Sequence, residues 1–273
     1  MPTLERAEIV GRGFCADVYA WGDGRVLKLF HGAAERADRE FAATQAIHST
    51  GLPVPAAFEM IEIDGRSGIV FERIDGATLF DRTQARPWTV FSALRLTGEL
   101  HASFNCCPAP AGLPSLHERI AARIEASDAP AVEKQGARER LASLPDSTTL
   151  CHGDFHPGNV ILSRRGPIVI DWSSASRGHY AGDVACTCHL MRTANLPPWA
   201  SWHAHLMLRC LRPTMRRSYL KWYFRQHPGS SQEVGDWQKV MALVPTEREV
   251  IRLDQRSLTG RMDQPVLDQR RGR

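Results

Sequence analysis

Long hydrophobic runs are missing from this chain of 273 residues. No stretch reaches the roughly 18 consecutive apolar residues that a membrane-spanning helix requires, so we expect no membrane partner. The first ten residues, MPTLERAEIV, carry charges and lack an apolar centre, which argues against a secretory signal. The chain also contains no internal repeat and no low-complexity segment.

Cysteine is present, but not in the patterns that imply disulfides or zinc. The chain has seven cysteines, an odd number, and no pair separated by two residues. This excludes a disulfide framework and favours the reducing cytoplasm. The run Cys186-Thr187-Cys188-His189 has the wrong spacing for a zinc knuckle. We interpret these residues as small buried side chains of a helix.

Neither sign of charge dominates, with a net charge of +4, and the 43% hydrophobic content is that of an ordinary globular protein. The length suits one core or two lobes of one unit.

Residues 206–225 combine aromatic and basic side chains, which would suit nucleic acid or a membrane surface. We interpret this segment as a helix with a solvated basic face over a buried aromatic stripe, and we expect no nucleic-acid partner.

The most informative stretch is LCHGDFHPGNVILSRRGPIVIDW, residues 150–172. Its apolar runs 160–162 and 168–170 are too short for helices and predict the two buried strands of a hairpin. Gly and Pro place the turn at 163–167. Closing the hairpin brings Asp154, Asn159 and Asp171 to one end of it.

These three polar side chains fit phosphoryl transfer. The reaction needs a carboxylate that orients and deprotonates the attacking hydroxyl, and oxygen ligands for a Mg²⁺ ion that neutralises the phosphates. Asp154 is the candidate base, and Asn159 and Asp171 are the candidate metal ligands. The Asp-to-Asn spacing of five positions is that of the kinase catalytic loop.

The motif HGDFHPGNV followed by IDW resembles the aminoglycoside phosphotransferase and choline kinase group, which shares the protein-kinase fold. The resemblance covers about Glu8 to Leu190 and is poor beyond Asn195. It implies an α+β, two-lobed fold with ATP between the lobes. Residues 1–75 would form the nucleotide-binding lobe, an antiparallel sheet with one helix. Residues 76–273 would form a larger, mainly helical lobe with the catalytic loop and the acceptor site.

Strand patterns support the small lobe. The runs 18–21 and 26–30 flank a Gly-Asp-Gly turn, the runs 57–63 and 68–74 flank a second turn, and residues 33–50 predict a helix.

The resemblance assigns nucleotide contacts within this lobe. The glycine-rich loop with Gly11 and Gly13 would cover the phosphates, and Lys28 would bind them. Glu40 on the helix would pair with Lys28, with Glu35 as the competing candidate. The backbone of Glu72 and Ile74 would meet the adenine.

The large lobe shows helical spacing at 90–104, 116–126, 133–144 and 206–225. Asp183 precedes a helical run and is interpreted as structural, either as a helix cap or as the family's tie to the catalytic loop. His101 and His117 are also interpreted as structural, and His152 as a residue that orients the loop. The final residues, within 246–273, are expected to be disordered.

We therefore expect an ATP- and Mg²⁺-dependent transfer of the γ-phosphoryl group to a hydroxyl of a small molecule. An aminoglycoside acceptor, and so antibiotic resistance, is one alternative. A nucleotide-binding module without catalysis is another. A protein kinase is disfavoured because no Ala-Pro-Glu element follows Asp171. The sequence gives no indication of an oligomeric state.

The distribution of charged residues along the chain indicates the charge of the acceptor molecule. Residues 173–273, which would line the acceptor site, hold 16 Lys and Arg against 8 Asp and Glu, whereas residues 1–172 hold 18 against 22. A polycationic aminoglycoside requires an acidic cleft. The acidic residues that could form one are Asp183, Glu233, Asp236, Glu247 and Glu249. We therefore expect a neutral or anionic hydroxyl compound.

Overall fold

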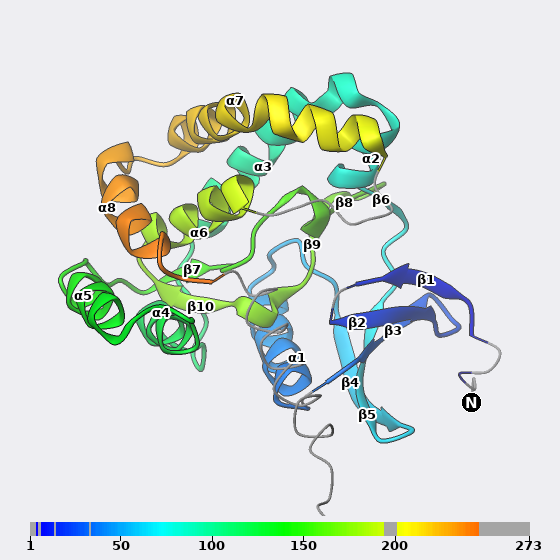
Figure 1. Ribbon diagram of the computed structural model, residues 1–273. Helices are drawn as coiled ribbons and strands as arrows, with labels where there is room; N and C mark the ends of the chain where they lie inside the picture. Colours follow the sequence, from blue (N-terminus) through cyan, green and yellow to red (C-terminus); the bar gives the residue numbers. More distant parts are fainter. Residues whose placement is uncertain (1–3, 5–6, 14, 33, 194–200, 246–273) are drawn as a thin grey trace, which may run out of the picture.

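A computed structural model describes residues 4, 7–13, 15–32, 34–193 and 201–245, which form two lobes (Figure 1). The small lobe is a five-stranded antiparallel sheet with the order β1-β2-β3-β5-β4. Its strands are β1 (Ile9–Arg12), β2 (Ala16–Ala20), β3 (Arg25–Phe30), β4 (Ala57–Ile63) and β5 (Arg66–Glu72). One helix, α1 (Ala34–His48), packs against β4 and β5. The predicted fold of this lobe is confirmed, although β1 was not predicted and β5 ends two residues earlier than expected.

Alternation along β3 explains how this sheet packs. Leu27 and Leu29 are buried on one face with Tyr19 and Val70. Phe30 is buried on the opposite face, against α1. Because side chains of a strand alternate between faces, Lys28 lies on the α1 side of the sheet.

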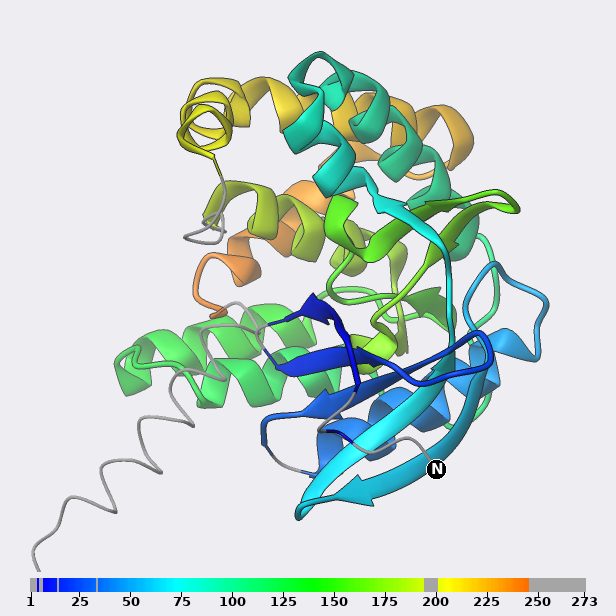
Figure 2. The same cartoon turned by 90° about the vertical axis from the view of Figure 1, so that its right-hand side faces the viewer.

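Helix α1 also joins the two lobes. Its later residues Ala43 and Ile47 share a buried cluster with Val160 and Trp172 of the large lobe. In Figure 2 the small sheet faces the viewer and α1 lies behind it, and Figure 1 shows α1 on the side of the sheet towards β10. The helix therefore fixes how the small lobe sits against the predicted hairpin.

The predicted hairpin exists as β8 (Val160–Ser163) and β9 (Gly166–Val169), joined to β6 (Gly76–Thr78) in the order β6-β8-β9. The predicted five-residue turn is wrong, because Ser163 pairs with Gly166 and only two residues form the turn. Pro167 lies within β9. Proline is tolerated there because β9 is an edge strand. On the open side of an edge strand no neighbouring strand needs the N–H donor that proline lacks.

Helices dominate the large lobe, as predicted. They are α2 (Leu79–Ala85), α3 (Val90–Asn105), α4 (Leu116–Glu125), α5 (Ala131–Ala142), α6 (Tyr180–Thr193), α7 (Trp202–Gln226) and α8 (Ser231–Met241). Two short strands, β7 (Thr149–Cys151) and β10 (Ser176–Gly178), pair beneath them. Three-residue turns of 3₁₀ helix occur at Pro87–Thr89, Pro157–Asn159 and Trp172–Ser174.

Sequence periodicity located the long helices but not every element. The short elements β6, β7, β10 and α2 were not predicted, nor was α8. None of the helices in the described ranges is both long and apolar enough to span a membrane. The predicted disorder near the C-terminus concerns residues that lie outside the described part of the chain.

Candidate active site

The catalytic loop, residues 152–159, connects β7 to β8 and carries Asp154 and Asn159. Gly153 begins it with φ of 79°, and a Cβ there would lie 2.5 Å from the carbonyl oxygen of Ser174. Only glycine fits this combination of positive φ and close approach. The Asn159 side chain then closes the loop, since its Nδ2 donates to the Asp154 carbonyl at 3.0 Å.

Asp171 lies two residues beyond β9, on the other side of the hairpin. The amide of Ile170 donates to the carbonyl of Asn159 at 3.0 Å, which places the two predicted metal ligands side by side. Asp171 itself has φ of 64° and ψ of 63°, a left-handed conformation that non-glycine residues rarely adopt. Its side chain is 36% exposed, and Asp171 lies beyond the end of the strand, where a ligand can reach it.

Lys28 and Glu40 form the ion pair that the resemblance implied. Nζ of Lys28 lies 2.7 Å from both carboxylate oxygens of Glu40. Ala37, Glu40, Thr44 and Ile47 are buried at helical spacing on one face of α1, and this face meets the sheet surface that carries Lys28. Glu35 is exposed, which rules out the competing pairing.

The same lysine reaches across to the large lobe, where its Nζ lies 3.2 Å from Oδ1 of Asp171. Burial lowers the pKa of Lys28, but Asp171 and Glu40 together outweigh burial and hold it above its usual value. Burial also raises the pKa of Asp171, yet Lys28 and the Ser173 hydroxyl bring it well below its usual range. Lys28 therefore carries a full positive charge at the junction of the lobes.

Burial of the Glu40 side chain disfavours its charged form. Burial raises its pKa to about 7, against the opposing effect of Lys28. A buried carboxylate without a cation would be strongly disfavoured, so Lys28 is the group that favours the ionised form of Glu40.

The glycine loop and the predicted adenine contacts lie on the small sheet. Gly11 is in β1, and the amide of Gly13 donates to the carbonyl of Ala16 at 2.8 Å, so this N–H already has a partner. The amide of Glu72 donates to Ala56, and its carboxylate pairs with Arg165 of the β8–β9 turn at 2.6 Å. Ile74 follows the end of β5 and is half-buried.

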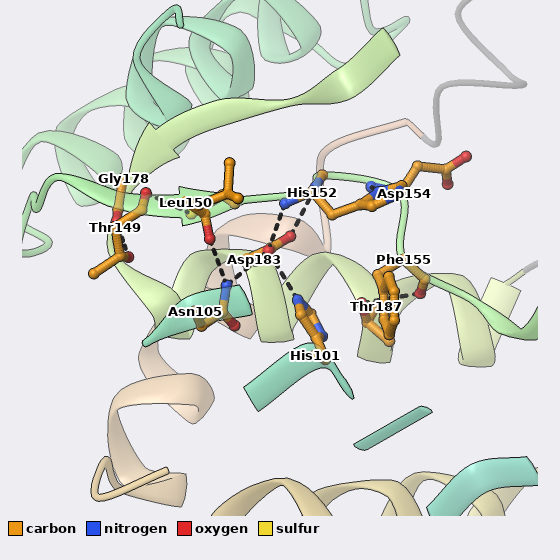
Figure 3. Close-up of polar contacts among 12 residues, drawn as sticks. His101, Asn105, Thr149, Leu150, His152, Asp154, Phe155, Gly178, Asp183 and Thr187 are labelled. Carbon is orange, nitrogen blue, oxygen red and sulfur yellow. Dashed lines mark hydrogen bonds and ion pairs between the residues drawn. The ribbon is translucent and has the colours of Figure 1, made fainter. Parts of the chain in front are cut away.

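Asp183 holds the start of the catalytic loop, as Figure 3 shows. Its Oδ2 accepts the amide of His152 at 2.7 Å and its Oδ1 accepts the amide of Gly153 at 2.8 Å. Burial raises the pKa of Asp183, but His101, Asn105 and these amides outweigh burial and lower it to about 2. Asp183 lies in the first turn of α6, inside the helix, so the capping interpretation is wrong and the tie to the loop is correct.

The role of His152 agrees with the prediction. Its ring is buried, with Nδ1 accepting from the amide of Asp154 at 3.3 Å and Nε2 lying 3.2 Å from the carbonyl of Ile170. One ring therefore connects the loop that carries Asp154 to the segment that carries Asp171.

Two contributors to this site escaped sequence reasoning. His101 Nε2 lies 2.8 Å from Oδ2 of Asp183, and Asn105 Nδ2 donates to the same oxygen at 3.0 Å. Both lie on α3, one helical turn apart. The available signal was their i, i+4 spacing on an apolar face, but no local motif linked them to residues about 80 positions later.

The comparisons with known proteins agree with this geometry. The family described as "Phosphotransferase enzyme family" matches residues 6–232, so the chain belongs to this family. The match continues past Asn195, beyond which the motifs are no longer recognisable by inspection. No curated protein sequence matches the chain.

Three solved structures with the same fold each have 19% sequence identity to this chain. A thermostable mutant of aminoglycoside phosphotransferase APH(4)-Ia has 19% identity and a TM-score of 0.58, covering 94% of this chain and 89% of its own. An aminoglycoside-3'-phosphotransferase of type VIII has 19% identity and a TM-score of 0.59, covering 87% and 93%. A choline/ethanolamine kinase family protein from Mesorhizobium loti has 19% identity and a TM-score of 0.59, covering 96% and 82%. The two-lobed protein-kinase-like fold is thereby confirmed.

Proposed function

We propose that this phosphotransferase uses ATP and Mg²⁺ to phosphorylate a hydroxyl group of a small molecule. The observation that best supports the proposal is that the two lobes each contribute side chains to one site. Lys28, held by Glu40, comes from the small lobe and lies 3.2 Å from Asp171, which the hairpin places beside Asn159 and the Asp154 loop. Phosphoryl transfer requires a cation for the phosphates, oxygen ligands for Mg²⁺ and a carboxylate for the hydroxyl.

Asp154 acts in this proposal as the base that orients the acceptor hydroxyl and takes its proton. Its side chain is 20% exposed, so an acceptor can reach it. The loop backbone donates hydrogen bonds to His152 Nδ1 and to the Asp183 carboxylate and accepts one from Asn159 Nδ2, and these bonds fix its position. Positioning of this kind supplies much of the rate in phosphoryl transfer, because the reaction depends on in-line geometry.

The donor set fits Mg²⁺. Lys28 and Ser173 both contact Oδ1 of Asp171, and Oδ2 has no hydrogen bond to the described residues. Nδ2 of Asn159 donates to Asp154, which directs the amide oxygen of Asn159 away from that bond. Among the described residues no three His, Cys, Asp or Glu side chains cluster into a metal cage. Mg²⁺ commonly binds through one or two protein oxygens plus nucleotide phosphates, and there it would neutralise phosphate charge.

The remaining nucleotide contacts are proposed by position. Gly11 of β1 and Gly13 of the turn that follows it would cover the phosphates, and Glu72 at the end of β5 and Ile74 after it would meet the adenine through their backbone. Gly76 begins β6, which pairs with β8 of the large lobe. We therefore place the boundary between the lobes at residues 75–76.

The acceptor, in this proposal, is neutral or anionic. Three of the acidic residues that could attract a polycation are already engaged. Asp183 is fully buried under the catalytic loop, Glu233 accepts the Tyr180 hydroxyl, and Asp236 pairs with Lys239. Helix α7 carries six Lys and Arg and no acidic residue. Glu247 and Glu249 lie outside the described residues.

A substrate panel tests the proposal. Purified protein with labelled ATP and Mg²⁺ is offered sugars, hydroxy acids, amino alcohols, aminoglycosides, a whole metabolite extract and a protein extract, with Asp154→Asn as the matched control. We expect label on an uncharged or anionic small molecule, lost in the control. Transfer to aminoglycosides would overturn the acceptor class alone. Labelling of proteins only, or no transfer to a whole metabolite extract despite nucleotide binding, would overturn the small-molecule kinase function.

A further inference from the structure

Two tyrosines of α7 extend the hydrogen-bond network beneath the catalytic loop. The Tyr219 hydroxyl lies 2.6 Å from Nδ1 of His101, and the Tyr223 hydroxyl donates to Oδ1 of Asn105 at 2.9 Å. His101 and Asn105 in turn contact Asp183, which accepts the amides of His152 and Gly153. Both tyrosines are fully buried.

A glycine in α3 allows α7 to pack closely against this helix. Gly98 lies in the interior of α3, where glycine costs about 1 kcal/mol relative to alanine. A Cβ at Gly98 would lie 2.7 Å from the carbonyl oxygen of Tyr219 and 2.9 Å from the amide nitrogen of Tyr223. The missing side chain is what lets α7 approach closely enough for both hydroxyls to reach α3.

Proton positions follow from the charges. Asp183 is ionised, so it can only accept, and Nε2 of His101 must carry the proton that it donates. In a neutral imidazole Nδ1 is then an acceptor, and the Tyr219 hydroxyl supplies its donor. Asp183 thus requires this His101 tautomer, and the Tyr219 hydroxyl gives its Nδ1 acceptor a hydrogen-bond donor.

We propose that Tyr219 and Tyr223 are positioning residues for the catalytic loop, acting through His101 and Asn105 on Asp183. Helix α7 is thereby coupled to the backbone of His152 and Gly153, immediately before Asp154. The proposal rests on the proposed function for the role of this loop, but its test does not require turnover.

The test compares Tyr219→Phe with Tyr180→Phe as a matched control. The Tyr180 hydroxyl also bonds a carboxylate, Glu233, in the same lobe, but it does not contact the Asp183 network. Hydrogen exchange of the His152 and Gly153 amides is measured relative to the Val169 amide, which bonds Pro53 instead. Nitrogen-15 shifts of His101 report its tautomer.

We expect exchange of both loop amides to accelerate about twofold to tenfold in Tyr219→Phe, the range for one lost hydrogen bond, with less change at Val169. His101 should be protonated at Nε2 in the wild type, and the nitrogen-15 shift of its Nδ1 should change in the variant, because Nδ1 loses the hydroxyl that it contacts. Equal acceleration in Tyr180→Phe, uniform acceleration across the lobe, or an Nδ1-protonated His101 in the wild type would overturn the proposal. Should Tyr219→Phe not fold, Tyr223→Phe is subject to the same exchange criteria through Asn105.

Discussion

At the scale of single residues, hydrogen bonds of the Asp154 amide to His152 and of its carbonyl to Asn159 fix the position of Asp154. Asp154→Asn keeps the size of the side chain and removes its basicity. We expect ATP to bind nearly as in the wild type, while transfer falls by about 10² or more, the usual scale for loss of a general base. Calorimetry and turnover measure the two effects separately, and turnover within a few-fold of the wild type would contradict the role of Asp154.

Lys28 and Glu40 act as a pair across the small lobe. Lys28→Met should weaken nucleotide binding and lower the rate, and Glu40→Gln should mainly lower the rate, because Glu40 acts by placing Lys28. The double variant should lose little beyond Lys28→Met. A double-mutant cycle on the rate checks this, and fully additive losses would show that the two residues act independently.

Asp183 makes stability depend on pH. Its folded-state pKa of about 2 lies below the ordinary 3.8, so the folded protein binds fewer protons than the unfolded chain as pH falls through this window. Its contribution is therefore fully present above about pH 5 and is lost towards pH 2, amounting to about 2 kcal/mol.

Urea unfolding of the wild type and Asp183→Asn between pH 2 and pH 7 measures this contribution. The stability advantage of the wild type should shrink as the pH falls. An advantage that stays constant, or grows in acid, would show that Asp183 is not held ionised by its partners.

At the scale of elements, two glycines inside helices allow a matched comparison. Gly98 of α3 faces the backbone of α7, whereas an added Cβ at Gly136 of α5 would meet nothing within 4 Å. Gly98→Ala should destabilise the protein by about 1–3 kcal/mol, because it forces α3 and α7 apart. Gly136→Ala should stabilise it by about 0.5–1 kcal/mol through helix propensity. Thermal or urea unfolding checks both, and a neutral Gly98→Ala would contradict the close packing of α3 on α7.

At the scale of the whole molecule, Asp171 meets Lys28 where the two lobes face each other. Asp171→Ala should abolish the gain in ATP affinity that Mg²⁺ provides, because the variant lacks the carboxylate ligand of the metal. Calorimetry with and without Mg²⁺ measures the gain, and Asp128→Ala, an exposed acidic position, is the control. A variant that binds MgATP like the wild type would exclude Asp171 as a ligand.

The sequence by itself was enough to predict the two lobes and the candidate residues of the site. The strand alternation of residues 26–30, the helical spacing around Glu40 and the five-residue separation of Asp154 and Asn159 are local patterns, so each could be interpreted without knowledge of distant contacts. The fold class and the Lys28–Glu40 pair were implied by the family resemblance of the motifs in which these patterns occur. The turn at Arg164-Arg165 was misplaced because Pro167 is tolerated on an edge strand, and strand order is not a local property.

Only the tertiary structure decided what holds the catalytic loop. Asp183 accepts bonds from His101 and Asn105, about 80 positions earlier, and these are held by α7, 118 positions after them. No periodicity encodes such contacts, because they depend on how three helices pack around a buried carboxylate. The left-handed backbone of Asp171, its partial exposure and its contact with Lys28 of the other lobe likewise follow no local pattern. The sequence names the reacting groups, and the packing of distant segments sets their positions.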